Sequence, residues 1–286
     1  MRDVTTVGIV AAGHMGSGLG AALREGGARV VTSVTGRSPR TVRFAAEAGL
    51  EALPTLADVV EAADVVLVVT PPGEARAAAT AIAQTGRNAL VADLNATSPS
   101  TVDDLAKTYA AAGLSFVDGS ISGPPPTVRP GARIYLSGPA AATVAALPWR
   151  HVQPVNLGGA VGTASAVKMC TASVYKGLEG LFAQALRAAA HYGVLDAVVA
   201  DLQAGRTGDP ARLAVAAAKA HRYVPEMREI AAAQHAAGLT PALFTAFAEV
   251  YAELARSPLG TADPESVSRT LSPHEVVAGM TPPPGP

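Results

Sequence analysis

The sequence predicts an α/β protein in which a doubly wound parallel sheet is followed by an all-helical domain. In the first half of the chain, short β-branched runs alternate with alanine-rich stretches of helical character. The runs are almost continuously apolar, which is typical of parallel strands covered by helices on both faces. After Gly158-Gly159 we find no convincing strand pattern. We therefore expect two domains, at residues 1–158 and 159–286.

The elements of the first domain follow from apolar runs, capping residues and turn residues. Gly26-Gly27 ends the first helix, Thr55 with Asp58 forms a capping box, and Ser98-Pro99 opens a helix that runs to about residue 112. The expected strands are Val4–Val10, Arg29–Val34, Asp64–Val69, Ala89–Asp93, Ser115–Asp118 and Arg133–Ser137, and the first helix is His14–Glu25.

The second domain is expected to begin with one long helix, Thr163–His191, which joins the two domains. Its 29 residues would span about 43 Å at 1.5 Å per residue. Shorter helices are expected at about 195–203, 211–219, 225–237 and 241–256. The tail from about residue 277 to 286, which ends in Pro-Pro-Pro-Gly-Pro, is expected to be disordered.

Composition narrows the classes of function. The 286 residues are 49% hydrophobic and 16% charged, with 22 basic and 23 acidic side chains. This balance gives no electrostatic reason to bind nucleic acid or an anionic membrane. The single cysteine, Cys170, fits a reducing compartment, and the apolar run Val65–Val69 is far too short to cross a bilayer. We expect a soluble, cytoplasmic protein, and the scattered histidines predict no metal site.

A glycine-containing turn follows the first strand and opens the first helix. It reads Ala11-Ala-Gly-His-Met-Gly16, a Rossmann-type dinucleotide fingerprint in which alanine replaces the first glycine. Such a turn brings the backbone and a helix N-terminus to a pyrophosphate. We expect cofactor contacts from Gly13, His14, Met15 and Gly16. The alternative is a glycine-rich turn with a purely structural role.

The residues after the second strand indicate which cofactor is bound. NAD sites usually place Asp or Glu there, on the ribose hydroxyls. This chain instead has Arg37, Ser38 and Arg40, and arginine can pair with a 2′-phosphate. The sequence therefore predicts NADP(H), unless these are ordinary solvated loop residues. Thr70, Pro71 and Asn95 follow two other parallel strands and are expected beside the nicotinamide and ribose.

Three motifs together resemble the β-hydroxyacid dehydrogenases, the relatives of 6-phosphogluconate and 3-hydroxyisobutyrate dehydrogenase. They are Gly13-His-Met-Gly16, Asp118-Gly-Ser-Ile-Ser-Gly123 and Gly162-Thr-Ala-Ser-Ala-Val-Lys-Met169. The segment from His221 to Ala231 is similar to a branch with a phosphogluconate-dehydrogenase-like C-terminal domain. The resemblance extends to about residue 258.

The resemblance implies that Lys168 is the general acid/base of the reaction, because a lysine on the long helix has that role in the family. Proton transfer to or from the substrate oxygen must accompany hydride transfer. From its sequence context alone, Lys168 could instead reach solvent. Ser122 and Gly123 match the pair that positions the substrate, although Ser122 could be only a turn residue. Pro124-Pro-Pro126 stands where the family has a second glycine.

The family's asparagine after the catalytic lysine is missing, and Thr171 or Ala172 takes its place. Thr171, Tyr175, Lys176 and Arg222 are secondary candidates for binding an anionic substrate. Because a small helical domain rarely closes an active site alone, we expect a homodimer formed through the helical domains.

Taken together, these observations predict an NADP(H)-dependent dehydrogenase or reductase that acts on a small hydroxy or keto acid. One alternative is an imine reductase of the same architecture, although those enzymes typically carry Asp or Tyr at the position of Lys168. The other is a non-catalytic NADP-binding sensor or scaffold, which the departures at Ala11, Thr171 and the triple proline motivate.

Overall fold

The computed structural model describes residues 5–204 and 209–282. The chain divides into two compact units, Met1–Met169 and Cys170–Pro286. The division falls inside helix α7 (Thr163–His191), not at residue 158, because the first turns of α7 are hydrogen-bonded into the sheet of the first unit. In the ranges that the structure describes, no helix is both long and apolar enough to cross a membrane.

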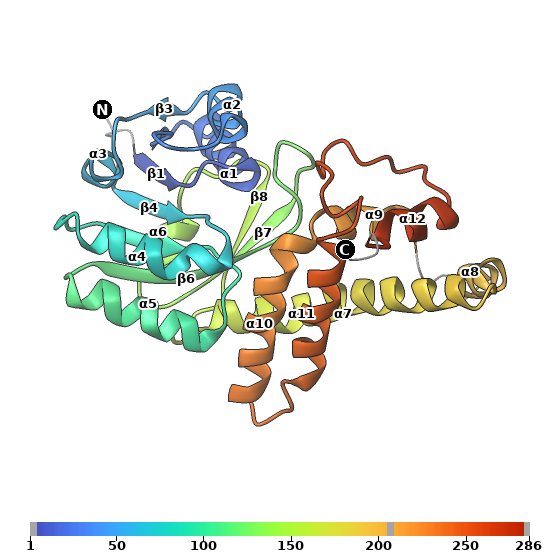
Figure 1. Cartoon of the computed structure of the whole chain (residues 1–286). Helices are drawn as coiled ribbons and strands as arrows, with labels where there is room; N and C mark the ends of the chain where they lie inside the picture. The colour runs from blue at the N-terminus through green and yellow to red at the C-terminus, as the bar shows by residue number, and fades with distance from the viewer. Residues whose placement is uncertain (1–4, 205–208, 283–286) are drawn as a thin grey trace. The chain divides into compact units, whose positions relative to one another are not determined.

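The described part of the first unit contains one eight-stranded sheet in the order β3-β2-β1-β4-β5-β6-β7-β8 (Figure 1). The chain moves outward from β1 in one direction and then returns to continue from β4 in the other, which creates a topological switch point between β1 and β4. The strands are β1 Thr6–Val10, β2 Arg29–Thr32, β3 Glu51–Ala52, β4 Val65–Val68, β5 Leu90–Asp93, β6 Ser115–Ser122, β7 Ala132–Ser137 and β8 Val152–Asn156.

Helices cover both faces of this sheet, as we expected. Because strand side chains alternate, Val7 and Ile9 pack on one face, with the core formed by α1, α2 and α6, whereas Val10 packs on the other, with α3, α4 and α5. The helices are α1 His14–Glu25, α2 Pro39–Glu47, α3 Leu56–Ala62, α4 Ala75–Ala83, α5 Pro99–Ala111 and α6 Ala141–Ala145; the 3-10 turn η1 spans Pro72–Glu74.

Local capping chemistry explains where several helices begin. The Thr55 side chain accepts a hydrogen bond from the backbone of Asp58, whose carboxylate accepts one from the Thr55 backbone, so the predicted capping box is confirmed. Ser98 caps α5, with Pro99 at its first position. These interactions are short-range, and for this reason the sequence predicts them well.

The direction of one strand pair differs from the prediction: β6 and β7 are antiparallel, although every other neighbouring pair is parallel. Residues 123–131 connect the two strands without a helix, and a crossover to a parallel neighbour needs a longer, usually helical, connection. Strand β6 also continues to Ser122, four residues beyond the expected end.

The described residues of the second unit form helices and connecting segments, with no strand among them. Helices α10 and α11 pack as an antiparallel hairpin (Figure 1). The bounds after α7 are α8 Leu195–Ala204, α9 Pro210–Ala218, α10 Ala220–Ala236, α11 Ala242–Leu254 and α12 Pro273–Met280. Helix α10 begins five residues before its expected start, with Pro225 inside it.

The expectation of a disordered tail from about residue 277 is wrong for the residues that the structure describes. Helix α12 extends to Met280, and Val276, Val277 and Met280 are buried. Ser272 and Glu275 form a capping box at its start. Burial of the apolar side chains and this cap together stabilise a helix that proline-rich composition did not indicate. Residues 283–286 lie outside the described residues.

Candidate functional site

The turn between β1 and α1 lies at the switch point of the sheet. Ala11 has φ of 67°, and its carbonyl accepts a hydrogen bond from the Gly13 backbone at 2.8 Å, so alanine adopts the left-handed conformation that a first glycine would adopt easily. A Cβ on Gly16 would lie 2.4 Å from the Ala11 oxygen, so only glycine fits there. A Cβ on Gly13 would meet nothing within 4 Å. The open space at Gly13 and the close contact at Gly16 fit a dinucleotide-binding turn.

Helix α1 begins at this turn without a side-chain cap. Its first turn contains no acidic residue, so its partial positive charge is available to an anion. His14, at the first position of α1, stacks on Phe44 of α2 with ring centroids 5.0 Å apart. The His14 ring is therefore engaged with α2, and the backbone at His14, Met15 and Gly16 is what the turn offers to a pyrophosphate.

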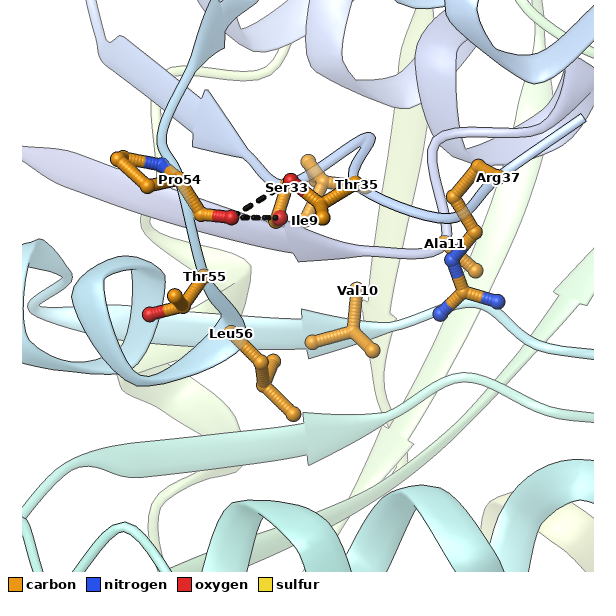
Figure 2. Close-up of a pocket in the computed structure, with 9 residues that line it drawn as sticks. All are labelled: Ile9, Val10, Ala11, Ser33, Thr35, Arg37, Pro54, Thr55 and Leu56. Carbon is orange, nitrogen blue, oxygen red and sulfur yellow. Dashed lines mark hydrogen bonds between the residues drawn. The ribbon is translucent and has the colours of Figure 1, made fainter. Parts of the chain in front are cut away.

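A pocket of about 290 Å³ lies at the ends of β1 and β2 and the start of α3 (Figure 2). Ala11 and Arg37 line it, and no acidic side chain does. Ser33 and Thr35 both donate hydrogen bonds to the Pro54 carbonyl, at 3.3 and 2.6 Å, which fixes the loop after β2. The pocket fits the adenosine end of a dinucleotide, with Arg37 as its cation.

Two of the three residues expected on a 2′-phosphate also make structural contacts within the protein. The Ser38 hydroxyl accepts a hydrogen bond from the Thr41 backbone at 3.3 Å and caps α2. Arg40 lies on α2 with its guanidinium over the Phe44 ring, 5.4 Å from the centroid. Only Arg37 of the three lines the pocket. Ser38-Pro39 is also the start of helix α2, which was not expected from the sequence.

Thr70 and Asn95 connect the ends of β4 and β5. Asn95 Oδ1 accepts a hydrogen bond from the Thr70 backbone at 2.6 Å, and its Nδ2 donates to the Thr70 hydroxyl at 2.9 Å. Asp93 in turn accepts hydrogen bonds from the Asn95 backbone and Nδ2, at 2.9 and 3.2 Å. Pro71, next in the chain, precedes the turn η1. The structure thus brings Thr70, Pro71 and Asn95 together at the sheet edge where ligands bind in this topology.

The Asp93 carboxyl is buried, and burial raises its pKa to about 7. The nearby charge of Asp118 raises this pKa further, whereas the hydrogen bond from the Asn95 backbone opposes the shift. Its burial penalises the charged form, so the carboxyl that orients Asn95 titrates near neutral pH.

A second buried carboxylate, Asp118 of β6, holds the start of α7. Its two oxygens accept hydrogen bonds from the backbone of Gly162 (3.0 Å) and Ser165 (3.1 Å) and from the hydroxyls of Ser137 (2.9 Å) and Ser165 (2.6 Å). A carboxylate at a helix N-terminus both satisfies free backbone donors and complements the helix dipole.

Neighbouring hydroxyls secure the same turn of α7. Ser137 accepts a hydrogen bond from the Ala164 backbone at 3.0 Å, and Ser120 donates one to the Ala164 carbonyl at 2.8 Å. The beginning of α7 is therefore attached to β6 and β7 and is part of the first unit.

Lys168 lies one turn beyond this attachment. Its Nζ donates a hydrogen bond to the Ile121 carbonyl of β6 at 2.9 Å, and the side chain is half-buried. The next residue of β6 is Ser122, followed by Gly123 with φ of 119°. A lysine ammonium, a serine hydroxyl and a glycine turn thus meet at the end of one strand. This arrangement can bind an anionic group and exchange a proton with it.

The triple proline that follows Gly123 packs against α1. A Cβ on Gly18 of α1 would lie 3.1 Å from Pro125 and 3.3 Å from Pro126, so the absence of a side chain at Gly18 permits this close packing. The substitution of proline for a second glycine therefore gives a rigid loop that contacts the helix of the dinucleotide turn.

The other expected substrate residues belong to the second unit. Lys176 pairs with Glu226 at 2.8 Å, and its Nζ lies 5.0 Å from the centre of the Tyr223 ring. Tyr175 is 59% exposed, Arg222 is exposed, and Thr171 is half-buried. The ion pair gives Lys176 a structural partner that its position on the helix did not reveal.

The sequence did not predict four polar residues of this site, which are Asp93, Asp118, Ser137 and Ser165. A local signal did exist for the first two, because each is an acidic residue near the carboxyl end of a buried apolar strand. A charge is rarely buried unless it has a specific partner, so such residues indicate a site.

Comparisons with known proteins agree with this geometry. The family model described as "NAD binding domain of 6-phosphogluconate dehydrogenase" matches residues 6–149, and one described as "Domain of unknown function (DUF1932)" matches residues 189–254. A comparison with curated proteins gives no match.

Several solved structures have a similar fold. The conserved protein MTH1747, of unknown function and reported to resemble 3-hydroxyacid dehydrogenases, is 29% identical, with 87% of this chain and 96% of that chain covered and a TM-score of 0.63. Mycobacterium tuberculosis 3-hydroxyisobutyrate dehydrogenase with L-serine is 20% identical, with 92% and 97% covered and a TM-score of 0.66. Streptomyces aurantiacus imine reductase is 18% identical, with 96% and 98% covered and a TM-score of 0.56.

The 6-phosphogluconate dehydrogenase model covers half of the chain, and its matched residues contain the turn, the pocket and strand β6 described above. The first unit is therefore an NAD(P)-binding domain, and the chain belongs to the family that shares this domain of 6-phosphogluconate dehydrogenase.

Proposed function

We propose that this protein is an NADP(H)-dependent oxidoreductase that interconverts a hydroxyl and a carbonyl group on a small organic acid. When bound, the nicotinamide supplies or accepts the hydride. The family assignment, the dinucleotide turn and the pocket at the end of β2 support cofactor binding. The observation that carries the chemistry is the position of Lys168, whose Nζ is held at the Ile121 carbonyl beside Ser122.

Lys168 is the proposed general acid/base. In the direction of reduction its ammonium donates a proton to the developing alkoxide oxygen, and in the direction of oxidation the neutral amine accepts the hydroxyl proton. The hydrogen bond to Ile121 restricts the motion of a long, flexible side chain, so less conformational entropy is lost when substrate binds.

The proposed anion site is the end of β6. The Ser122 hydroxyl can donate a hydrogen bond to a carboxylate, and the positive φ of Gly123 turns the backbone there without a side chain. Lys168 adds a positive charge at the same place. These groups favour a small acid over a neutral alcohol as substrate.

The preference for NADP over NAD is proposed from the pocket in Figure 2. Arg37 lines it, and none of the lining residues is Asp or Glu. A carboxylate would repel a 2′-phosphate, whereas a guanidinium pairs with it. Arg37→Ala should weaken NADPH binding much more than NADH binding, and tighter binding of NADH by the wild type would contradict this assignment.

The reaction is tested by following NADPH absorbance with a panel of small keto acids, neutral carbonyl compounds and cyclic imines. We expect turnover of keto acids, and Lys168→Met should reduce kcat by about a hundredfold or more while leaving the NADPH Kd unchanged. Lys107→Met is the matched control, because Lys107 is 79% exposed on α5. Unchanged turnover in Lys168→Met would refute the role of Lys168.

The same panel separates the two alternatives. Turnover of imines without keto acids would identify an imine reductase. Tight NADPH binding with no turnover of any compound would favour a sensor or scaffold.

A further inference from the structure

The helical unit contains a cavity of its own, outside the dinucleotide-binding domain. Its volume is about 270 Å³, slightly below the range of typical ligand pockets. One face of α9 forms its wall, with Ala211, Val215 and Lys219 at successive helical turns. Tyr223 of α10 and Arg269 also line it. The cavity combines a small apolar wall, one aromatic ring and several charges.

The charges that line this cavity are not balanced by one another. Arg212 pairs with Glu179 at 3.3 Å, and Asp209 accepts a hydrogen bond from the Ala211 backbone at 3.0 Å as the cap of α9. Lys219 and Arg269 remain. Within residues 5–204 and 209–282, neither of these side chains makes a hydrogen bond or ion pair. The lining therefore carries an excess of positive charge, with three cations against two acidic side chains, and Glu179 attracts Lys219 without a direct ion pair.

Lys219 is the more informative of the two, because it is half-buried. Burial lowers its pKa, and the positive charges of Arg222, Arg269 and Lys176 lower it further, against the opposing effect of Glu179. Several cations thus converge on one ammonium in a partly desolvated position. Such an arrangement is unfavourable in isolation and becomes favourable when an anion binds.

We propose that this cavity of the helical unit binds a small organic dianion, held by Lys219 and Arg269 against the apolar wall of α9. Each of the two cations can pair with one negative charge of a dianion, and the small volume suits a compact ligand. The Tyr223 ring and Val215 offer contacts to the organic part of the ligand. Dicarboxylates and phosphate monoesters share this chemistry.

Isothermal titration calorimetry with succinate and with phenyl phosphate, on the full-length protein, tests the proposal and distinguishes the two dianions. We expect saturable binding of at least one, weaker at higher ionic strength. Lys219→Gln should reduce its affinity by about tenfold or more, because a charged partner is lost. Lys107→Gln, which removes the same charge from an exposed position, should leave the affinity unchanged.

Arg269→Gln provides a second test, because Arg269 is exposed and its replacement removes no packing. It too should weaken binding if the cavity is the site. Absence of saturable binding for both dianions at millimolar concentrations would overturn the proposal, as would equal affinity in all variants. The NADPH Kd should be unchanged in both cavity variants, so failure here is distinguishable from failure of the proposed dehydrogenase activity.

Discussion

Replacing Asp118 by Asn tests whether this carboxylate fixes the start of α7 and, through it, Lys168. The carboxylate is buried and accepts four hydrogen bonds from three residues. Asn keeps the shape of the side chain but removes the negative charge, so its single oxygen is a neutral acceptor of hydrogen bonds. The Asn side-chain NH₂ group would also take the place of one carboxylate oxygen, next to hydrogen-bond donors that now lack an acceptor.

The expected loss of stability follows from these bonds. A hydrogen bond to a charged acceptor contributes about 1.5–3 kcal/mol, against about 0.5–1.5 kcal/mol for a neutral one. Four such differences do not add fully, and removing the charge relieves repulsion with Asp93. We therefore expect Asp118→Asn to lower the free energy of unfolding of the first unit by about 2–4 kcal/mol.

Urea unfolding followed by tryptophan fluorescence measures this change. The single tryptophan, Trp149, belongs to the first unit and donates a hydrogen bond to the Val144 carbonyl at 3.0 Å, so its emission reports this unit. Asp103→Asn is the matched control, because Asp103 is exposed on α5. A loss below about 0.5 kcal/mol, the range of ordinary surface substitutions, would refute the anchoring role.

A kinetic measurement separates anchoring from general destabilisation. In folded Asp118→Asn protein, kcat should fall because Lys168 is less well placed, while the NADPH Kd should stay the same because the β1–α1 turn is intact. A parallel change in both quantities would indicate a loss of folded protein rather than a displaced lysine.

Three further predictions concern other parts of the chain. Ala11→Gly should raise the urea midpoint, corresponding to a gain of up to about 1 kcal/mol from relieved backbone strain, and a lower midpoint would contradict this. Because the pKa of Asp93 is raised to about 7, the folded state binds its proton more tightly than the unfolded state does. The free energy of unfolding should therefore be greatest near pH 4 with respect to this group and should decrease by at most about 4 kcal/mol as the pH rises through 7. Asp93→Asn should flatten this pH dependence in unfolding titrations. Helix α7 carries an exposed apolar stripe formed by Val174, Leu178 and Leu181, and we propose that this stripe contributes to a homodimer. Leu181→Asp should shift the mass measured by sedimentation toward that of the monomer, and a monomeric wild type would contradict the assignment.

The elements that the sequence predicts well are those specified by neighbouring residues. The limits of α1 and α7 agree with the expected ones, and the Thr55–Asp58 capping box is present. Strand β8 escaped detection because Pro154 interrupts it and it pairs with β7 alone, as is usual for an edge strand containing proline. Helix α6 is only five residues long, too short for a periodic pattern.

The candidate site was only partly predictable, for a related reason. The turn at Gly13 and Gly16 is a local motif, and its space and contacts can be inferred from a few residues. The backbone partners of Asp118 at the start of α7, Gly162 just before the helix and Ser165 within it, lie 44 and 47 residues away in the sequence, and no local pattern indicates them. Long-range pairing of this kind depends on the packing of the sheet against the helix, which composition and periodicity do not determine.

The geometry of β6 and α7 explains why lysine suits position 168. Asp118 contacts Ser165, and three residues further along each element Ile121 accepts from Lys168. A side chain at position 168 must bridge the space between the helix and the strand to reach this carbonyl. The four-carbon stem of Lys168 does so and presents a donor to the Ile121 carbonyl, whereas an ionised Asp would be short and would present only acceptors. The same register that satisfies the buried Asp118 carboxylate therefore delivers an amine to the residue beside Ser122, which is the position that the proposed role of Lys168 requires.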